Sequence, residues 1–369
     1  MVDMLENGRI STKQLAILVI YFIIGDMLLI LPSLTAAASK QDAWLSGGIG
    51  FLIGWPIAWF LFRFSRIFPN LTIIEYNRRL LGKWIGGIIS IFYLYYFLTT
   101  VSILIREAGD FLTTQIFTNT PMNAIHLILI ILLVWGVKSG LETIARTAET
   151  FFPLYFLLFL SLFILLIPQA QLIRLQPILG GGILPTIRGS FYTCTFSFCE
   201  LCSLLMLFPR VISSNHTERD YLLGVFFGGM AICSTILLTV LVIGPNLASI
   251  HLYATYITAQ KINIGNFVQR VEAILALNWI ISTYFKSVLD LYAFLVGTAQ
   301  FFKLRDYRSL SVPTGMIIFG LAFTVTPNVV YFNKVVDYYI FWDVTCALGI
   351  PMLLYIVYLF RKNKLLTPR

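Results

Sequence analysis

The chain has 369 residues, of which 58% are hydrophobic and only 12% are charged, and its formal net charge is +9. Because soluble domains usually contain about 25% charged residues, this composition excludes an ordinary soluble protein and indicates an integral membrane protein. Apolar stretches of membrane-spanning length recur along the whole sequence, so we expect one polytopic membrane domain over residues 1–369.

Hydropathy divides the chain into about ten predicted transmembrane helices. In chain order they cover residues 12–38, 43–64, 84–108, 121–138, 149–168, 183–209, 220–244, 268–302, 311–328 and 337–360. Segments on the N-terminal side of the membrane contain 18 Lys and Arg residues, against 6 on the opposite side. Since basic residues gather in cytoplasmic loops, both termini are predicted to be cytoplasmic. This topology accounts for the net positive charge, so no nucleic acid partner is needed to explain it.

The first predicted span contains an aspartate, Asp26, directly after Gly25 in the apolar stretch IIGDMLLILP. A carboxylate at the centre of a bilayer costs about 2.5–3.5 kcal/mol on insertion scales. A helix that breaks at this point would free backbone groups, which is tolerated only where they line a cavity or are buried in protein. Two interpretations remain open. Asp26 faces a polar cavity, or it is protonated or internally paired and serves helix packing alone.

The sixth span repeats the pattern of the first. Glu200 precedes LMLFP, which ends at Pro209, as Asp26 precedes LLILP, which ends at Pro32, and a glycine-rich span follows each proline. We therefore expect two five-helix repeats, about 12–168 and 183–360, with helices 1 and 6 interrupted. An odd number of spans per repeat places the halves upside down relative to each other, as in secondary transporters that bind ligands near the midplane.

A polar stripe runs along the predicted eighth span. Asn278, Ser282, Lys286 and Asp290 recur every four residues and therefore share one helix face. The same spacing predicts an intramembrane ion pair between Lys286 and Asp290. This pair is either a structural link between helices or part of a cavity, and the sequence alone leaves both possibilities open. Thr283 and Ser287 flank the stripe.

The third span carries a similar stripe of Tyr93, Tyr96, Thr100 and Glu107. These residues either face a cavity or are packing residues with satisfied hydroxyls. No nucleophile elbow, phosphate loop, zinc-ligand spacing or dinucleotide fingerprint occurs in the sequence. We therefore expect no enzyme activity, no cofactor and no metal site.

Several segments resemble the B subunits of spore germinant receptors. This permease-like family of endospore-forming bacteria belongs to the amino acid–polyamine–organocation superfamily. The similar segments include ISTKQLAILVIYFIIGDMLLILP, KQDAWLSGGIGFLIG, FPNLTIIEYNRRLLGKWIGGIISIFYLYYF, GLETIARTAE and IGNFVQRVEAILALNWI. The resemblance covers essentially the whole chain.

The resemblance implies an all-α, leucine-transporter-like fold in the spore inner membrane. It also implies an A subunit and a lipoprotein C subunit as partners, and a small amino acid or sugar as the germinant.

The resemblance further implies a ligand pocket between the first, third, sixth and eighth helices. The implied residues are Gly25, Asp26, Met27, Tyr96, Thr100, Val101, Phe198, Cys199, Glu200, Thr283 and Ser287. An ionised Asp26 would repel a ligand carboxylate. Asp26 is therefore expected to be protonated or to face the amino group of the ligand, or else the ligand is a neutral polyol such as a sugar. The alternative function is a secondary amino-acid permease, cation-coupled through Asp26, Glu200 or the Lys286–Asp290 pair.

Overall fold

The computed structural model describes residues 8–262 and 271–365, most of which lie in helices. The start of the predicted eighth span, residues 268–270, lies outside the described residues. The α-helices are α2 (Thr12–Ile24), α3 (Met27–Ser39), α4 (Ala43–Ser65), α5 (Ile73–Phe111), α6 (Met122–Ser139), α7 (Leu141–Leu166), α8 (Ile183–Phe198), α9 (Thr217–Ile243), α10 (Pro245–Ile250), α11 (Ala254–Gln260), α12 (Glu272–Phe302), α13 (Ser311–Thr324), α14 (Val329–Val344) and α15 (Ile350–Leu365). The 3₁₀ segments are η1 (Lys40–Asp42), η3 (Ile167–Gln169), η4 (Leu172–Leu175), η5 (Cys199–Met206), η6 (Phe208–Arg210) and η7 (Arg308–Leu310), and the π-helical turns are η2 (Leu112–Ile116) and η8 (Thr345–Gly349).

Seven helical stretches of the described chain are long and apolar enough to cross a membrane. They are Met27–Ser65, Ile73–Ile116, Met122–Ser139, Leu141–Gln169, Thr217–Ile243, Glu272–Phe302 and Lys334–Arg361. Three other helices within predicted spans are shorter, with 13 residues in α2, 16 in α8 and 14 in α13. The chain is a multi-pass membrane protein, while the count of ten spans remains a prediction.

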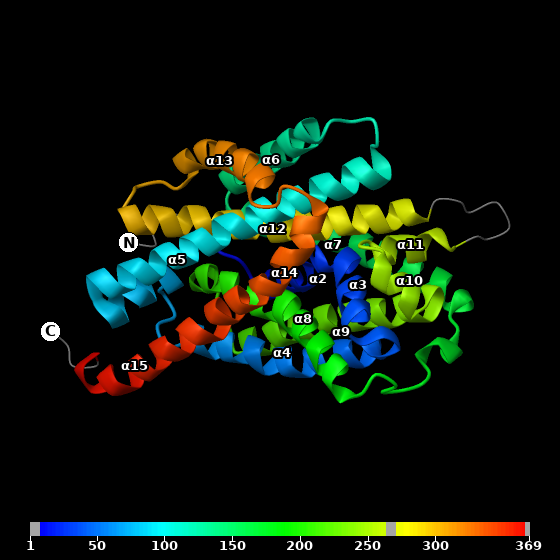
Figure 1. Cartoon of the computed structure of the whole chain (residues 1–369). Helices are drawn as coiled ribbons and strands as arrows, with labels where there is room; N and C mark the ends of the chain where they lie inside the picture. The colour runs from blue at the N-terminus through cyan, green and yellow to red at the C-terminus, as the bar shows by residue number, and fades with distance from the viewer. Residues whose placement is uncertain (1–7, 263–270, 366–369) are drawn as a thin grey trace.

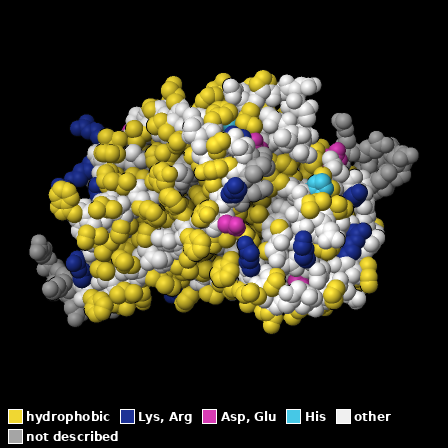
Figure 2. All heavy atoms as spheres, viewed as in Figure 1, with side chains coloured by type: hydrophobic (Ala, Val, Ile, Leu, Met, Phe, Trp, Pro, Cys, Tyr) yellow, Lys and Arg dark blue, Asp and Glu magenta, His cyan; other side chains and the backbone are white. Residues whose placement is uncertain are grey.

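The outer surface of the molecule is apolar. Hydrophobic side chains cover much of the face drawn in Figure 2, and large residues such as Trp84 and Phe360 are almost fully exposed. Soluble proteins rarely present contiguous apolar patches of more than a few hundred square ångströms, so this surface suits contact with lipid.

Helices α2 and α3 lie at the centre of the molecule (Figure 1). Helix α9 packs against α2, α8 packs against α3, and α4 packs against both α8 and α9. On the other side α12 packs against α2, and the long helix α5 runs beside α12, with α6 and α13 beyond it (Figure 1). Most residues of α2 and α3 are buried, and Asp26 between them is 3% exposed, so Asp26 lies inside the protein rather than in lipid.

Helix α5 is longer than the predicted third span. It begins at Ile73, where the Thr72 hydroxyl and the Glu75 carboxylate form a capping box, and it breaks at Gly82, whose φ is 83°. A positive φ is readily adopted only by glycine. Residues 73–81 therefore form a short helical arm before the main part of α5, and Leu80 O there accepts a hydrogen bond from Arg361 Nη1 of α15 at 2.7 Å.

The close approach of α4 and α8 depends on glycine. A Cβ atom placed on Gly54 would lie 2.3 Å from Cγ of the buried Phe198. We expect Gly54→Ala to lower the free energy of unfolding by about 1–3 kcal/mol, because overpacking a filled interface displaces side chains. Gly48, on the same helix, has no atom within 4 Å of such a Cβ. Thermal unfolding of the purified variants should show a loss for Gly54→Ala and none for Gly48→Ala. Equal stability of the two would contradict this packing.

Candidate functional site

The break in the first span is present at Gly25. Helix α2 ends at Ile24 and α3 begins at Met27, while Gly25 has φ 30° and ψ −131°. Two side chains of α12 bind the carbonyl oxygens freed by the break. Ser282 Oγ donates to Gly25 O at 2.9 Å, and Trp279 Nε1 donates to Asp26 O at 3.0 Å. The predicted interruption of helix 1 is thus confirmed, and α12 satisfies its open backbone.

The break in the sixth span has a different form. The α-helix α8 ends at Phe198, and the chain continues as the 3₁₀ segment η5, which begins at Cys199 and contains Glu200. Glu200 therefore lies just after the end of the α-helix, where the interruption of the sixth span was predicted. The chain continues in 3₁₀ turns as far as Arg210 rather than returning to an α-helix.

Lys286 of α12 joins the two breaks. Its side chain is fully buried, and Nζ lies 2.5 Å from Asp26 Oδ1 and also forms an ion pair with the Glu200 carboxylate. Asp26 belongs to the first break and Glu200 to the second. An isolated charge buried in protein costs several kcal/mol, and here one ammonium binds two carboxylates from opposite halves of the sequence.

The predicted ion pair between Lys286 and Asp290 is wrong. Both carboxylate oxygens of Asp290 are buried and have no hydrogen-bond partner within the described chain. The reason lies in tertiary packing. Helix α12 packs against α2 and η5, which bring Asp26 and Glu200 to the Lys286 ammonium group.

A small cavity lies beside these ion pairs. Its volume is about 40 Å³, and its walls come from α3, α5, the end of α8 and α14. Three carboxylates are among its lining residues, together with two hydroxyl groups and apolar side chains. The lining residues are Asp26, Met27, Ile30, Leu34, Thr100, Ile103, Leu104, Glu107, Phe196, Glu200, Val335, Val336 and Tyr339.

The structure brings together only part of the implied pocket. Asp26, Met27, Thr100 and Glu200 line the cavity. Gly25 lies behind it and packs against Lys286, whose Cδ would be 2.6 Å from a Cβ at this position.

Four further implied residues support the cavity or lie outside it. Tyr96 donates a hydrogen bond to Asp343 Oδ1 at 2.9 Å and does not line the cavity. Phe198 packs against Phe51, with 5.8 Å between their ring centroids. Val101 and Cys199 are fully buried and are not among the lining residues.

Thr283 and Ser287 are not part of this cavity. They line a separate apolar cavity of about 190 Å³ between α5, α6, α7 and α12. The resemblance implied them as ligand contacts, but the polar stripe of α12 faces Asp26 and Gly25 while its flank faces α5 and α6. Their contact with a ligand stays a prediction, and the structure does not place them beside Asp26 and Glu200.

Sequence reasoning missed the contribution of α14. Tyr339 lines the cavity, and its hydroxyl oxygen lies 2.6 Å from that of Thr100. Asp343, one turn further along α14, is fully buried beneath Tyr96. A carboxylate within an apolar span was the signal that identified Asp26, and the same signal was present at Asp343.

A larger vestibule adjoins the cavity. Its volume is about 520 Å³, and its lining includes Arg188 and Tyr192 of α8, His251, and Asp337 of α14. Tyr192 donates a hydrogen bond to Asp337 Oδ1 at 2.5 Å, which ties α8 to α14. Leu34 and Val336 line both spaces and separate them.

The carboxylates around Lys286 do not form a metal site. Within the described residues, no group of three or more His, Cys, Asp or Glu side chains is arranged to hold a metal ion. The carboxylate, hydroxyl and apolar groups that line the cavity can form ionic, hydrogen-bonding and apolar contacts.

Solved structures of similar fold are membrane transporters. One is Mhp1, a nucleobase-cation-symport-1 family transporter in a closed conformation with bromovinylhydantoin bound. It has a TM-score of 0.70 and 10% identity, covering 97% of this chain and 80% of that one. Another is MhsT in complex with L-phenylalanine, with a TM-score of 0.64 and 13% identity, covering 94% and 97%. The predicted leucine-transporter-like architecture is confirmed, and these classes are not enzymes.

Sequence comparisons identify the family. Residues 9–330 match the family model described as spore germination protein. Spore germination protein KB of Bacillus subtilis (strain 168) is 28% identical over 367 residues, covering 98% of this chain and 97% of that protein. Spore germination protein YndE of the same organism is 26% identical over 306 residues, covering 81% and 83%. Because the family model spans most of the sequence, the chain belongs to the spore germination protein family.

Proposed function

We propose that this chain is the nutrient-sensing subunit of a spore germination receptor. It binds a small amino acid or sugar in the cavity between the two helix breaks and signals to partner subunits. One observation carries the proposal: Lys286 bridges a carboxylate from each break at the edge of a small cavity. The two transporters of similar fold each hold a small organic ligand, which supports a binding role for this architecture.

The signal follows from competition for the ion pairs. Asp26 and Glu200 line the cavity and also bind Lys286, so a ligand that contacts either carboxylate changes the balance between α3, η5 and α12. A ligand shifts a conformational equilibrium only through its different affinities for the two states. Moving the ratio of the two conformations from 1:99 to 99:1 requires the ligand's binding free energies for them to differ by about 5.5 kcal/mol.

The membrane setting and partners complete the proposal. The chain works in the spore inner membrane beside a membrane-embedded A subunit and a lipoprotein C subunit, as the resemblance to germinant receptor B subunits implies. Both termini lie on the cytoplasmic side, which the excess of Lys and Arg in the segments on that side supports.

Deletion of the chain in its own spore-forming host tests this function. Mutant spores are expected to lose the response to one nutrient, or one group of nutrients, while responding normally to the others. The readout is loss of refractility after single amino acids and sugars are added, and re-expression of the intact chain is the control. Unaltered responses to every nutrient would reject the sensing role.

Flux measurements separate sensing from transport. A permease requires coupled uptake of the nutrient into proteoliposomes that contain only this chain, whereas a sensor does not. Uptake that persists in spores with a blocked germination response would favour the permease.

A further inference from the structure

Glu107 is a buried carboxylate that forms no ion pair with any described residue. It lies on α5, seven residues after Thr100 and on the same side of the helix, and it lines the central cavity. The residue is 4% exposed, and its Oε1 atom has no hydrogen-bond partner among the described residues. No ion pair to Glu107 is present in that part of the chain either.

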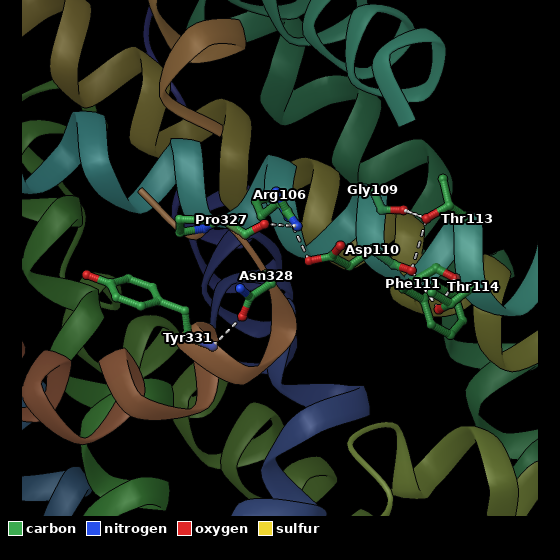
Figure 3. Close-up of polar contacts among 9 residues, drawn as sticks. All are labelled: Arg106, Gly109, Asp110, Phe111, Thr113, Thr114, Pro327, Asn328 and Tyr331. Atoms are coloured by element: carbon green, nitrogen blue, oxygen red, sulfur yellow. Dashed lines mark hydrogen bonds and ion pairs between the residues drawn. The ribbon is translucent and has the colours of Figure 1, made fainter. Parts of the chain in front are cut away.

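Both buried cations of the neighbouring helix segments bind other groups. Lys286 pairs with Asp26 and Glu200. Arg106 precedes Glu107 in the chain, but its Nε donates to Asp110 Oδ2 at 2.8 Å and its Nη2 donates to Pro327 O at 3.1 Å. Figure 3 shows Arg106 directed toward Asp110 and Pro327. The cavity therefore has three lining carboxylates, of which two bind Lys286 directly and Glu107 does not.

A carboxylate buried without a partner is strongly unfavourable unless it gains a cation or a proton. The other walls of the cavity near Glu107 are apolar, with Ile103, Leu104 and Ile30 among them. We propose that the cavity binds a small ligand through its primary ammonium group, which forms a charge-assisted hydrogen bond with Glu107. This inference rests on the proposed binding role of the cavity and names the chemical group that it recognises.

The size of the cavity limits the rest of the ligand. A cavity needs about 10–15 Å³ to hold one water molecule, so the volume of about 40 Å³ accommodates a body of only a few heavy atoms. A short aliphatic chain suits the apolar walls, and a hexose is too large for this conformation. The ammonium group meets Glu107 while the aliphatic part contacts Ile30 and Leu104.

Matched probes test the ammonium group directly. The purified full chain is heated with propylammonium, with 1-propanol at the same concentration, and with L-alanine or D-glucose. Propylammonium and 1-propanol have similar size and differ mainly in charge. We expect propylammonium to raise the melting temperature in a saturable manner and 1-propanol and D-glucose to leave it unchanged. L-alanine has the ammonium group and also a carboxylate, so it is expected to raise the melting temperature at higher concentrations than propylammonium, because Asp26 and Glu200 line the same cavity.

A variant then links this binding to Glu107. Glu107→Gln keeps the shape of the side chain and removes its charge, so it is expected to weaken the apparent affinity for propylammonium by about 10- to 100-fold, as for loss of a hydrogen bond to a charged group. Glu142→Gln is the matched control, because Glu142 lies on the surface and pairs with Arg146. This control should bind propylammonium as the original chain does. The probe series on the original chain remains decisive if Glu107→Gln does not fold.

The inference is overturned if 1-propanol and propylammonium stabilise the chain equally, which would mean that Glu107 carries a proton. It is also overturned if Glu107→Gln binds propylammonium as well as the original chain does, or if neither propylammonium nor L-alanine stabilises the original chain. Saturable stabilisation by D-glucose, equal in Glu107→Gln, rejects the ammonium group but leaves the sensing role intact. Propylammonium binding at Glu107, together with deletion spores that respond to every nutrient, rejects the sensing role but leaves the ammonium site.

Discussion

Replacing Lys286 with methionine is expected to lower the free energy of unfolding by about 3–5 kcal/mol, because removal of one partner leaves buried carboxylates unpaired. Methionine keeps much of the length and apolar character of the lysine side chain, so the loss reports on charge rather than on volume. Asp26 and Glu200 would then repel each other beside the cavity. Thermal unfolding and the yield of monodisperse purified protein measure the effect.

Compensating substitutions identify the true partners of Lys286. Combining Lys286→Met with Asp26→Asn and Glu200→Gln removes all three charges and is expected to restore much of the stability, since neutral replacements of buried ion pairs are often tolerated. Combining Lys286→Met with Asp290→Asn is the matched control and should restore little. Rescue by the Asp290 substitution alone would reinstate the pairing that helix spacing predicts and contradict the structure.

Alanine at Gly25 is expected to have the second large effect. The backbone there has φ 30° and ψ −131°, a conformation that costs about 1–3 kcal/mol for residues other than glycine. The added Cβ would also lie 2.6 Å from Lys286 Cδ, so the lysine must move away from its carboxylate partners. We expect a lower melting temperature, and also a weaker response of the receptor to its nutrient in spores that carry Gly25→Ala.

Gly82→Ala separates the two causes. Gly82 also has a positive φ, 83°, yet no atom lies within 4 Å of the position that an added Cβ would occupy there. Gly82→Ala should show the backbone effect alone, and the nutrient response should be retained. If Gly25→Ala and Gly82→Ala reduce stability and response equally, contact with Lys286 plays no part in the effect.

The break at Gly25 could be predicted because its signals are local. A glycine, a carboxylate and a downstream proline within one apolar stretch favour a broken helix at any position along a membrane span. The same reasoning located Glu200 at the end of α8. Such signals need no knowledge of neighbouring helices.

The partners of Lys286 could not be predicted in the same way. Asp26 is 260 positions away in the chain, and only the packing of α12 against α2 brings the two together. Spacing along one helix suggested Asp290, the nearest carboxylate in sequence, whereas the neighbouring segments that pack against α12 supply the actual partners.

Helix rotation explains why Thr283 and Ser287 lie apart from the cavity beside Asp26. Each residue turns an α-helix by about 100°, so a step of one position from Ser282 or Lys286 changes the neighbouring helix. Ser282 meets Gly25, while Thr283 meets the apolar cavity beside α5 and α6. The periodicity of a stripe identifies its inward face but not where that face ends. Glu107 was visible in the stripe of α5, and only the three-dimensional structure shows that it lines the cavity.

Leu34 and Val336 line both the vestibule and the central cavity, and this shared position bears on how fast the cavity fills. Two apolar side chains share no hydrogen bond that must break before they move apart. We therefore expect bulkier apolar residues at these two positions to slow the entry of a ligand from the vestibule, while its affinity, which depends on the charged and hydroxyl groups of the cavity, changes less.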